Sequence, residues 1–213
     1  MADTLVKICG ISTPETLAAC IAARADWVGF NFFPPSPRFL TSAAAAQLAA
    51  QGEGAIRKAG VFVDADDAAL AEAVQAGRLD AIQLHGHESP ARAAQVRQRF
   101  GLPVWKVLSV ASAADVARAA DYNGAADFLL FDAKTPKGQL PGGMGLAFDW
   151  SLLSAYRGPL LWGLAGGLTP ANVAEAVRLV RPGLVDTASG VESAPGRKDV
   201  DKIAAFCKAA RQA

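Results

Sequence analysis

A cysteine and an aspartate each close an apolar run of this sequence in a way that suits proton transfer. Cys9 ends "VKIC", and Lys7 lies two residues earlier, on the same face if the run is a strand. A nearby ammonium favours the thiolate form of a cysteine. Asp132 ends a second run in "DFLLFDAK". A thiolate and a carboxylic acid can remove and donate protons on one substrate, although a small core cysteine and a solvated loop aspartate are the simpler alternatives.

Two glycine-rich stretches indicate a binding site for phosphate. "LAGGLTPAN" contains Gly166 and Gly167, and "DTASGVES" contains Asp186, Ser189 and Gly190. Glycines let backbone N–H groups approach an anion, and a serine hydroxyl adds another donor. Either stretch alone could be an ordinary turn, but the two together favour a phosphate site.

Three other polar residues are candidates for substrate contacts. Arg38 lies in "NFFPPSPRF", where the prolines stiffen its loop, so its guanidinium suits a carboxylate unless it merely covers the surface. Gln83 and His85 share one face of the run in "IQLHGHE". A glycine separates the two histidines in this motif and no third ligand accompanies them, so no metal site is expected.

These residues must be positioned by alternating strands and helices. Strands are expected at residues 4–9, 27–33, 57–63, 80–85, 103–109, 127–132, 159–165 and 184–188. Helices are expected near residues 13–24, 41–51, 66–77, 89–100, 112–121, 149–156, 170–180 and 199–211, with starts marked by "STPE", "DADD", "ESPA" and "LTPA".

Eight strand–helix units predict an α/β fold in which residues 1–213 form a single (β/α)8 TIM barrel. A doubly wound open sheet is the alternative, but the first turn, "CGIS", is not the glycine pattern of that fold. In such barrels the active site lies at the carboxyl ends of the strands, and the loops after strands seven and eight commonly bind phosphate. The candidate residues should therefore meet at one mouth.

Composition narrows the possible partners. The chain has 213 residues and a net charge of +1, so nucleic acid and anionic membranes are not expected as main partners. No apolar stretch is long enough to span a bilayer, and the first residues do not resemble a signal peptide. The odd cysteine count, without a CxxC pair, suits a reduced cytoplasm.

The motifs together resemble the phosphoribosylanthranilate isomerases of tryptophan biosynthesis. The resemblance rests on "KICGI", "GFNFFPPSPRF", "QLHG", "FDAKTPKGQLPGGMGLAFDW", "LAGGLTPANV" and "VDTASGVESAPGRKD", in order along nearly the whole chain. It implies an Amadori rearrangement of a phosphorylated substrate without cofactor or metal. Asp132 would be the general acid and Cys9 the general base. Arg38 would hold the anthranilate carboxylate and the glycine-rich loops the phosphate.

One departure and three rival functions stay open. Met144 stands where the resembled family usually has a small polar residue. Bifunctional histidine- and tryptophan-pathway isomerases have an aspartate in place of Cys9 and an internal repeat, neither of which is present. Indole-glycerol-phosphate synthase needs lysine and glutamate catalysts that cannot be placed here, and a phosphosugar sensor would need no acid–base pair. The sequence allows a monomer or a homodimer.

Overall fold

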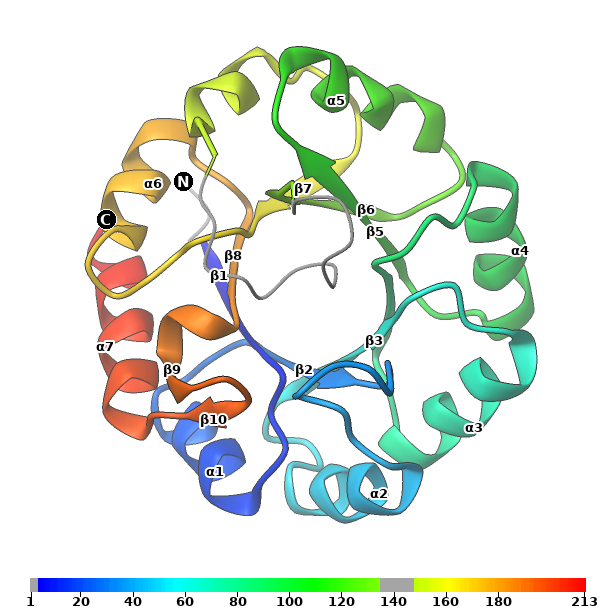
Figure 1. Ribbon diagram of the computed structural model, residues 1–213, viewed down its shortest axis with the longest axis vertical. Helices are drawn as coiled ribbons and strands as arrows, with labels where there is room; N and C mark the ends of the chain where they lie inside the picture. The colour runs from blue at the N-terminus through cyan, green and yellow to red at the C-terminus, as the bar shows by residue number, and fades with distance from the viewer. Residues whose placement is uncertain (1–3, 135–147) are drawn as a thin grey trace.

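The computed structural model describes residues 4–134 and 148–213 and has the predicted TIM-barrel architecture. Eight parallel strands form a closed barrel in sequence order, with β8 paired to β1 (Figure 1). The strands are β1 (Leu5–Cys9), β2 (Trp27–Asn31), β3 (Arg57–Phe62), β4 (Ala81–Leu84), β5 (Val104–Val110), β6 (Phe128–Ala133), β7 (Leu161–Leu164) and β8 (Leu184–Thr187). Each lies within two residues of its predicted bounds.

Helices surround this barrel and cover its outer face (Figure 1). They are α1 (Pro14–Ala22), α2 (Ser42–Gln51), α3 (Asp67–Gly77), α4 (Pro90–Phe100), α5 (Ala113–Ala117), α6 (Val173–Val180) and α7 (Val200–Arg211). The segment after α5 and the segment before β7 are 3₁₀ helices, η1 (Arg118–Tyr122) and η2 (Trp150–Ala155). The α-helix expected near residues 149–156 is therefore wrong in type, because six residues followed by Gly158 and Pro159 are too few for a stable α-helix.

Side-chain caps explain most helix starts. Thr13, Asp66 and Ser89 each accept a hydrogen bond from the backbone N–H three residues later, as their motifs predict. The start expected at "LTPA" is wrong, because α6 begins at Val173 after a turn. In that turn the Asn172 side chain accepts from the Thr169 N–H and holds the chain out of the helix.

The barrel interior is filled from its amino-terminal end by large side chains. Trp27 and Trp105 lie edge to face with ring centroids 4.7 Å apart, and Leu130, Val107 and Leu184 pack with them. The inward positions nearer the carboxyl ends of the strands carry polar groups instead. The large apolar side chains therefore fill the lower part of the barrel interior, and the polar residues lie above them at the carboxyl ends of the strands.

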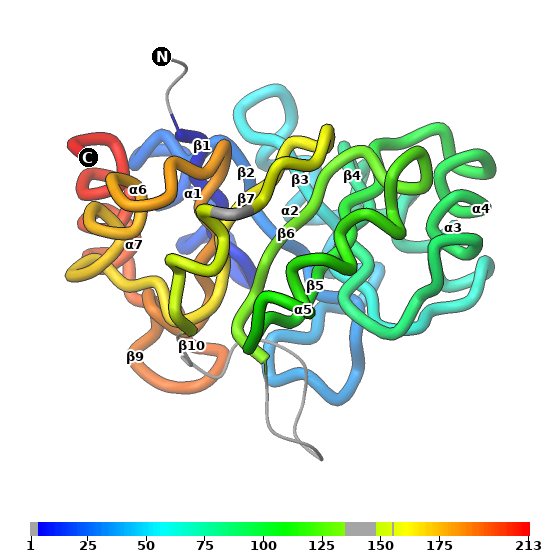
Figure 2. Tube along the Cα trace, turned by 90° about the horizontal axis from the view of Figure 1, so that it is seen from above, coloured from blue at the N-terminus to red at the C-terminus, as the bar shows by residue number. Residues whose placement is uncertain are grey.

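A short antiparallel hairpin follows the last barrel strand and was not predicted. The 3₁₀ helix η3 (Ser189–Val191) leads into β9 (Glu192–Ala194) and β10 (Arg197–Lys198). In Figure 2 this hairpin lies on the side of the barrel away from the start of β1, which is the side where the strands end. The hairpin thus belongs to the mouth of the barrel.

Two expectations from the sequence concern Met144 and membrane-spanning segments. Met144 and the glycine-rich stretch around it lie outside the described residues. Of the helices in the described part of the chain, none is long and apolar enough to cross a membrane.

Candidate active site

Strand β1 brings Cys9 and Lys7 to the mouth on one inward face. Lys7 is fully buried, and its Nζ lies 3.0 Å from Oδ2 of Asp186 on β8. Burial raises the pKa of the Cys9 thiol overall, although the Lys7 ammonium beside it acts in the opposite direction. The placement of Lys7 beneath the thiol agrees with the sequence prediction. Its charge is shared with Asp186, however, and does not by itself make Cys9 a thiolate.

Gly29 on β2 makes room for the thiol. It pairs in register with Cys9, and a Cβ at this position would lie 2.7 Å from Cys9 Sγ and 3.2 Å from Lys7 Nζ. Any larger residue would push on the thiol and on the ammonium. No sequence pattern indicated a role for Gly29, since only the strand register reveals it.

Asp132 on β6 joins His85 and Gln83 on the opposite wall. His85 Nε2 lies 3.3 Å from Asp132 Oδ2, and the Ala133 N–H donates to Oδ1 at 2.8 Å. The Gln83 amide Nε2 lies 3.4 Å from His85 Nδ1. If the amide donates to Nδ1, the imidazole presents its Nε2–H to the carboxylate. The three residues predicted at these strand ends therefore form one connected group.

Two buried acceptors in this region have no partner among the described residues. They are Oε1 of Gln83 and Oδ1 of Asp186. Asp186 lies on β8, which the order of strands places between β1, with Cys9, and β6, with Asp132. Buried acceptors without donors are costly unless a ligand or water supplies them, which makes both atoms candidates for substrate hydroxyl contacts.

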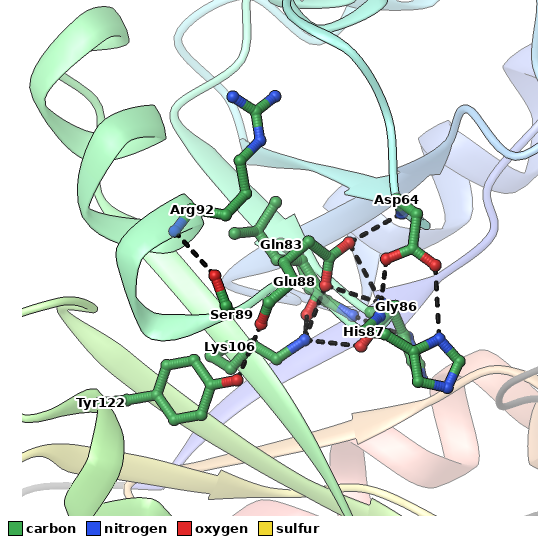
Figure 3. Close-up of polar contacts among 11 residues, drawn as sticks. Asp64, Gln83, Gly86, His87, Glu88, Ser89, Arg92, Lys106 and Tyr122 are labelled. Carbon is green, nitrogen blue, oxygen red and sulfur yellow. Dashed lines mark hydrogen bonds and ion pairs between the residues drawn. The ribbon is translucent and has the colours of Figure 1, made fainter.

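The loop after β4 is held by a buried ion pair on the outer side of the barrel wall. Glu88 accepts from the backbone N–H groups of Asp64 and Gly86, and Lys106 Nζ donates to its Oε2 at 2.6 Å (Figure 3). Lys106 also donates to the Gly86 carbonyl at 2.7 Å, and the Tyr122 hydroxyl donates to the Glu88 carbonyl. Gly86 is thus fixed at both its N–H and its carbonyl, directly after His85.

The second histidine of "HGHE" takes no part in the mouth. The His87 side chain is 98 % exposed and pairs with Asp64 (Figure 3). Within residues 4–134 and 148–213, no group of three His, Cys, Asp or Glu side chains is placed to hold a metal ion.

The two glycine-rich loops lie together beside Asp132. Gly166 and Gly167 have φ of +83° and +66°, and a Cβ on Gly166 would lie 2.5 Å from the Ala133 backbone nitrogen. A Cβ on Gly190 would overlap the Leu168 carbonyl oxygen, so the loop after β8 touches the loop after β7. Ser189, half-buried, begins η3 at this junction.

Two further side chains that sequence reasoning missed secure the junction. The Thr187 hydroxyl donates to the Leu168 carbonyl at 2.8 Å, and the Asn172 amide donates to the Gly167 carbonyl at 3.0 Å. They hold the glycine backbone in a fixed shape, as a backbone anion site requires.

Arg38 is fixed by a carboxylate from the hairpin as well as by its prolines. Its Nε and Nη2 donate to the two oxygens of Glu192 at 2.8 and 2.7 Å. Burial would raise the pKa of Glu192, but Arg38 and Lys198 hold it below its usual range. No sequence motif indicated this partner, which lies 154 residues away.

Comparison with known sequences finds close relatives over nearly the whole chain. The family described as N-(5'-phosphoribosyl)anthranilate (PRA) isomerase matches residues 6–209. An N-(5'-phosphoribosyl)anthranilate isomerase from Paramagnetospirillum magneticum is 56 % identical over 207 residues, covering 97 % of this chain and 96 % of the relative. One from Rhodopseudomonas palustris is 54 % identical over 208 residues, covering 97 % and 95 %.

Solved structures agree with this match. The phosphoribosyl anthranilate isomerase of Thermotoga maritima has a TM-score of 0.89 at 36 % identity, covering 99 % of this chain and 100 % of that one. A phosphoribosyl anthranilate isomerase in complex with reduced 1-(o-carboxyphenylamino)-1-deoxyribulose 5-phosphate has a TM-score of 0.86 at 34 % identity, with the same coverage. A further Thermotoga maritima structure shows monomers derived from a dimeric enzyme.

Proposed function

The chain belongs to the N-(5'-phosphoribosyl)anthranilate isomerase family, and from this we propose that it isomerises N-(5-phosphoribosyl)anthranilate to 1-(2-carboxyphenylamino)-1-deoxyribulose 5-phosphate in tryptophan biosynthesis. The observation that carries the proposal is the placement of Cys9 and Asp132. Each is the last inward-facing residue of its strand, Cys9 on β1 and Asp132 on β6, so both lie at the same mouth of the barrel. Strands β7 and β8 lie between β6 and β1. The glycine-rich loops follow those two strands and would hold the phosphate.

Asp132 would act first, as the general acid. It would protonate the furanose ring oxygen as the bond from that oxygen to C1 breaks, which leaves a Schiff base between C1 and the anthranilate nitrogen. The carboxylate formed on Asp132 would be stabilised by the Ala133 N–H and by His85 Nε2–H. The His85–Gln83 contact would keep the imidazole turned toward the acid.

Cys9 would act second, as the general base. Its thiolate would remove the proton from C2 to give an enolamine, and proton transfer from the C2 hydroxyl to C1 would complete the ketone. C1 is reduced while C2 is oxidised, so the reaction balances without an external oxidant or reductant. Lys7, beside the thiol, would stabilise the thiolate while it is formed.

The remaining residues would bind the substrate. Arg38 would hold the anthranilate carboxylate. The backbone of Gly166, Gly167 and Gly190 and the Ser189 hydroxyl would hold the phosphate. The buried acceptors of Gln83 and Asp186 would take hydrogen bonds from sugar hydroxyls.

The decisive experiment follows the fluorescence of N-(5-phosphoribosyl)anthranilate as it is consumed. Wild type should consume it, whereas Asp132→Asn and Cys9→Ser should each lower kcat by about 10²–10⁴-fold, which is what a general acid or base contributes. Cys20→Ser, a buried cysteine in α1, is the matched control and should retain turnover as long as it folds.

Two outcomes would contradict the proposal. Near wild-type rates in both Asp132→Asn and Cys9→Ser would remove the acid–base mechanism. An inactive wild type that still binds the substrate would favour the rival function, a phosphosugar sensor.

A further inference from the structure

Glu192, the first residue of β9, is a buried carboxylate with partners on both oxygens. Its Oε1 accepts from Arg38 Nε at 2.8 Å and from Lys198 Nζ at 2.7 Å. Its Oε2 accepts from Arg38 Nη2 at 2.7 Å and from the Gly196 N–H at 3.2 Å. A two-point pair of this kind fixes both the plane and the rotation of a guanidinium.

The loops around Arg38 are in close contact with one another. A Cβ on Gly10, which follows Cys9 with φ of +76°, would lie 2.6 Å from Arg38 Cδ. A Cβ on Gly196, at the hairpin turn with φ of +77°, would lie 2.5 Å from the Pro37 carbonyl oxygen. The stem of Arg38 is therefore packed against the loop beside the thiol, and the preceding residue, Pro37, is packed against the hairpin that carries Glu192.

The side chains of Arg38, Glu192 and Lys198 form a cluster with more positive than negative charge. One carboxylate, Glu192, contacts two cationic side chains, Arg38 and Lys198. The Lys198 side chain is 1 % exposed, and it also donates to the carbonyl of Ala188, next to Ser189. Counted over these three side chains the formal charge is +1, and their contacts join the arginine loop to the glycine-rich loop after β8.

We propose that Glu192 is a positioning residue that orients Arg38 toward the substrate carboxylate and thereby sets the selectivity for a carboxylated arylamine. The inference rests on the proposed function, because it concerns the same substrate. Lys198 places a second positive charge beside Glu192, so these three side chains together carry a net positive charge next to the position proposed for the ligand carboxylate. Without Glu192 the guanidinium would rotate away, and the two buried cations would repel each other.

The test compares two substrates that differ only in this carboxylate, N-(5-phosphoribosyl)anthranilate and N-(5-phosphoribosyl)aniline. The measured quantity is the ratio of their kcat/KM values in wild type, Arg38→Ala, Glu192→Gln and Glu192→Asp. Glu192→Gln should lower the ratio about tenfold or more, mainly through KM for the carboxylated substrate, since a charge-assisted contact is lost. Glu192→Asp, which keeps the charge, should recover part of the ratio.

Controls separate positioning from a general effect on the fold. Glu72→Gln, at an exposed position of α3, should leave the ratio unchanged. If Glu192 only stabilised the fold, its replacement would lower kcat/KM for both substrates equally, and the unchanged ratio would overturn the proposal. Should Glu192→Gln not fold, an unchanged ratio in the double variant Glu192→Gln with Lys198→Met would overturn it in the same way.

The two proposals fail in different ways. A wild type that does not consume the carboxylated substrate would contradict the proposed function itself. If the ratio falls in Arg38→Ala but is unchanged in Glu192→Gln, only the role of Glu192 is contradicted. An unchanged ratio in Arg38→Ala would remove Arg38 from the carboxylate site and Glu192 with it.

Discussion

Glu88 and Glu192 are buried to a similar degree near the mouth, yet they face different amounts of positive charge. Glu88 is hydrogen-bonded to one ammonium, Lys106, and to backbone N–H groups. Glu192 is hydrogen-bonded to two cations, Arg38 and Lys198. A neutral pair can hold a loop but has no net charge with which to attract an anion, whereas a cluster of charge +1 can do both.

Their positions agree with this difference. Lys106 alternates with Trp105 and Val107, which pack in the barrel interior, so its side chain lies on the outer face of β5. From there it donates to the Gly86 carbonyl. The stem of Arg38 lies against Gly10, next to Cys9. We therefore assign Glu88 to the scaffold and the Glu192 cluster to ligand recognition, and three predictions test that contrast.

The largest expected effect is on stability, from Glu88. Glu88→Gln would leave Lys106 buried without its counter-charge, so the free energy of unfolding should fall by about 3–5 kcal/mol. Adding Lys106→Met should restore much of the loss, because the unpaired charge is then gone. Urea unfolding measures both.

The exposed pair Glu53–Arg78 supplies the control. Glu53→Gln should change the free energy of unfolding by about 1 kcal/mol or less, because both side chains are in water. A loss below about 1 kcal/mol in Glu88→Gln would mean that this pair does not hold the loop.

The pH dependence of Cys9 ionisation should distinguish the clusters next. Burial raises the pKa of Cys9, Lys7 and Lys198 lower it, and Asp186 raises it. Alkylation by iodoacetamide requires the thiolate, so the alkylation rate of Cys9 should rise about tenfold per pH unit while the thiol is mostly protonated. Lys198→Met should move this rise to higher pH, and Glu88→Gln with Lys106→Met should not.

The alkylation rate of Cys9, followed by mass spectrometry against pH in these variants, provides the measurement. A wild-type alkylation rate that stays constant between about pH 6 and 9 would contradict the expectation that the Cys9 thiol is mostly protonated there. If both sets of variants shifted the rise to higher pH by the same amount, the two clusters would not differ in their electrostatic effect on the Cys9 thiol.

The smallest of the three effects is on substrate affinity. Lys198→Met would reduce the Glu192 cluster to a neutral pair, so KM for N-(5-phosphoribosyl)anthranilate should rise about tenfold. KM for the aniline analogue should change much less. Initial rates measure both constants, and equal changes for the two substrates would assign Lys198 a structural role only.

The barrel and much of its mouth follow from local sequence patterns. Period-two alternation assigned Lys7, Cys9 and Asp132 to inward faces, and the strand count brought their ends together. Gln83 and His85 lie beside Asp132 for the same reason. Periodicity reports which way a side chain points, and this sufficed for residues on strands.

The charge partners could not be predicted in this way. Arg38 and Glu192 are 154 residues apart, and alternation says nothing about which loop will meet another. One signal was available, since Lys106 interrupts the apolar run "VWKVL" and a buried lysine needs an anion nearby. It indicated that a partner exists but not that the partner is Glu88.

The ion pair between Lys7 and Asp186 has a consequence for folding during synthesis on the ribosome. The two residues are 179 positions apart, which a ribosome covers in roughly 10–40 s at about 5–20 residues per second. For that time the lysine beneath Cys9 lacks its anion, and β1 lacks one of its two neighbours. Onset of activity during synthesis should therefore coincide with closure of the barrel, and nascent chains that end before β8 should be inactive.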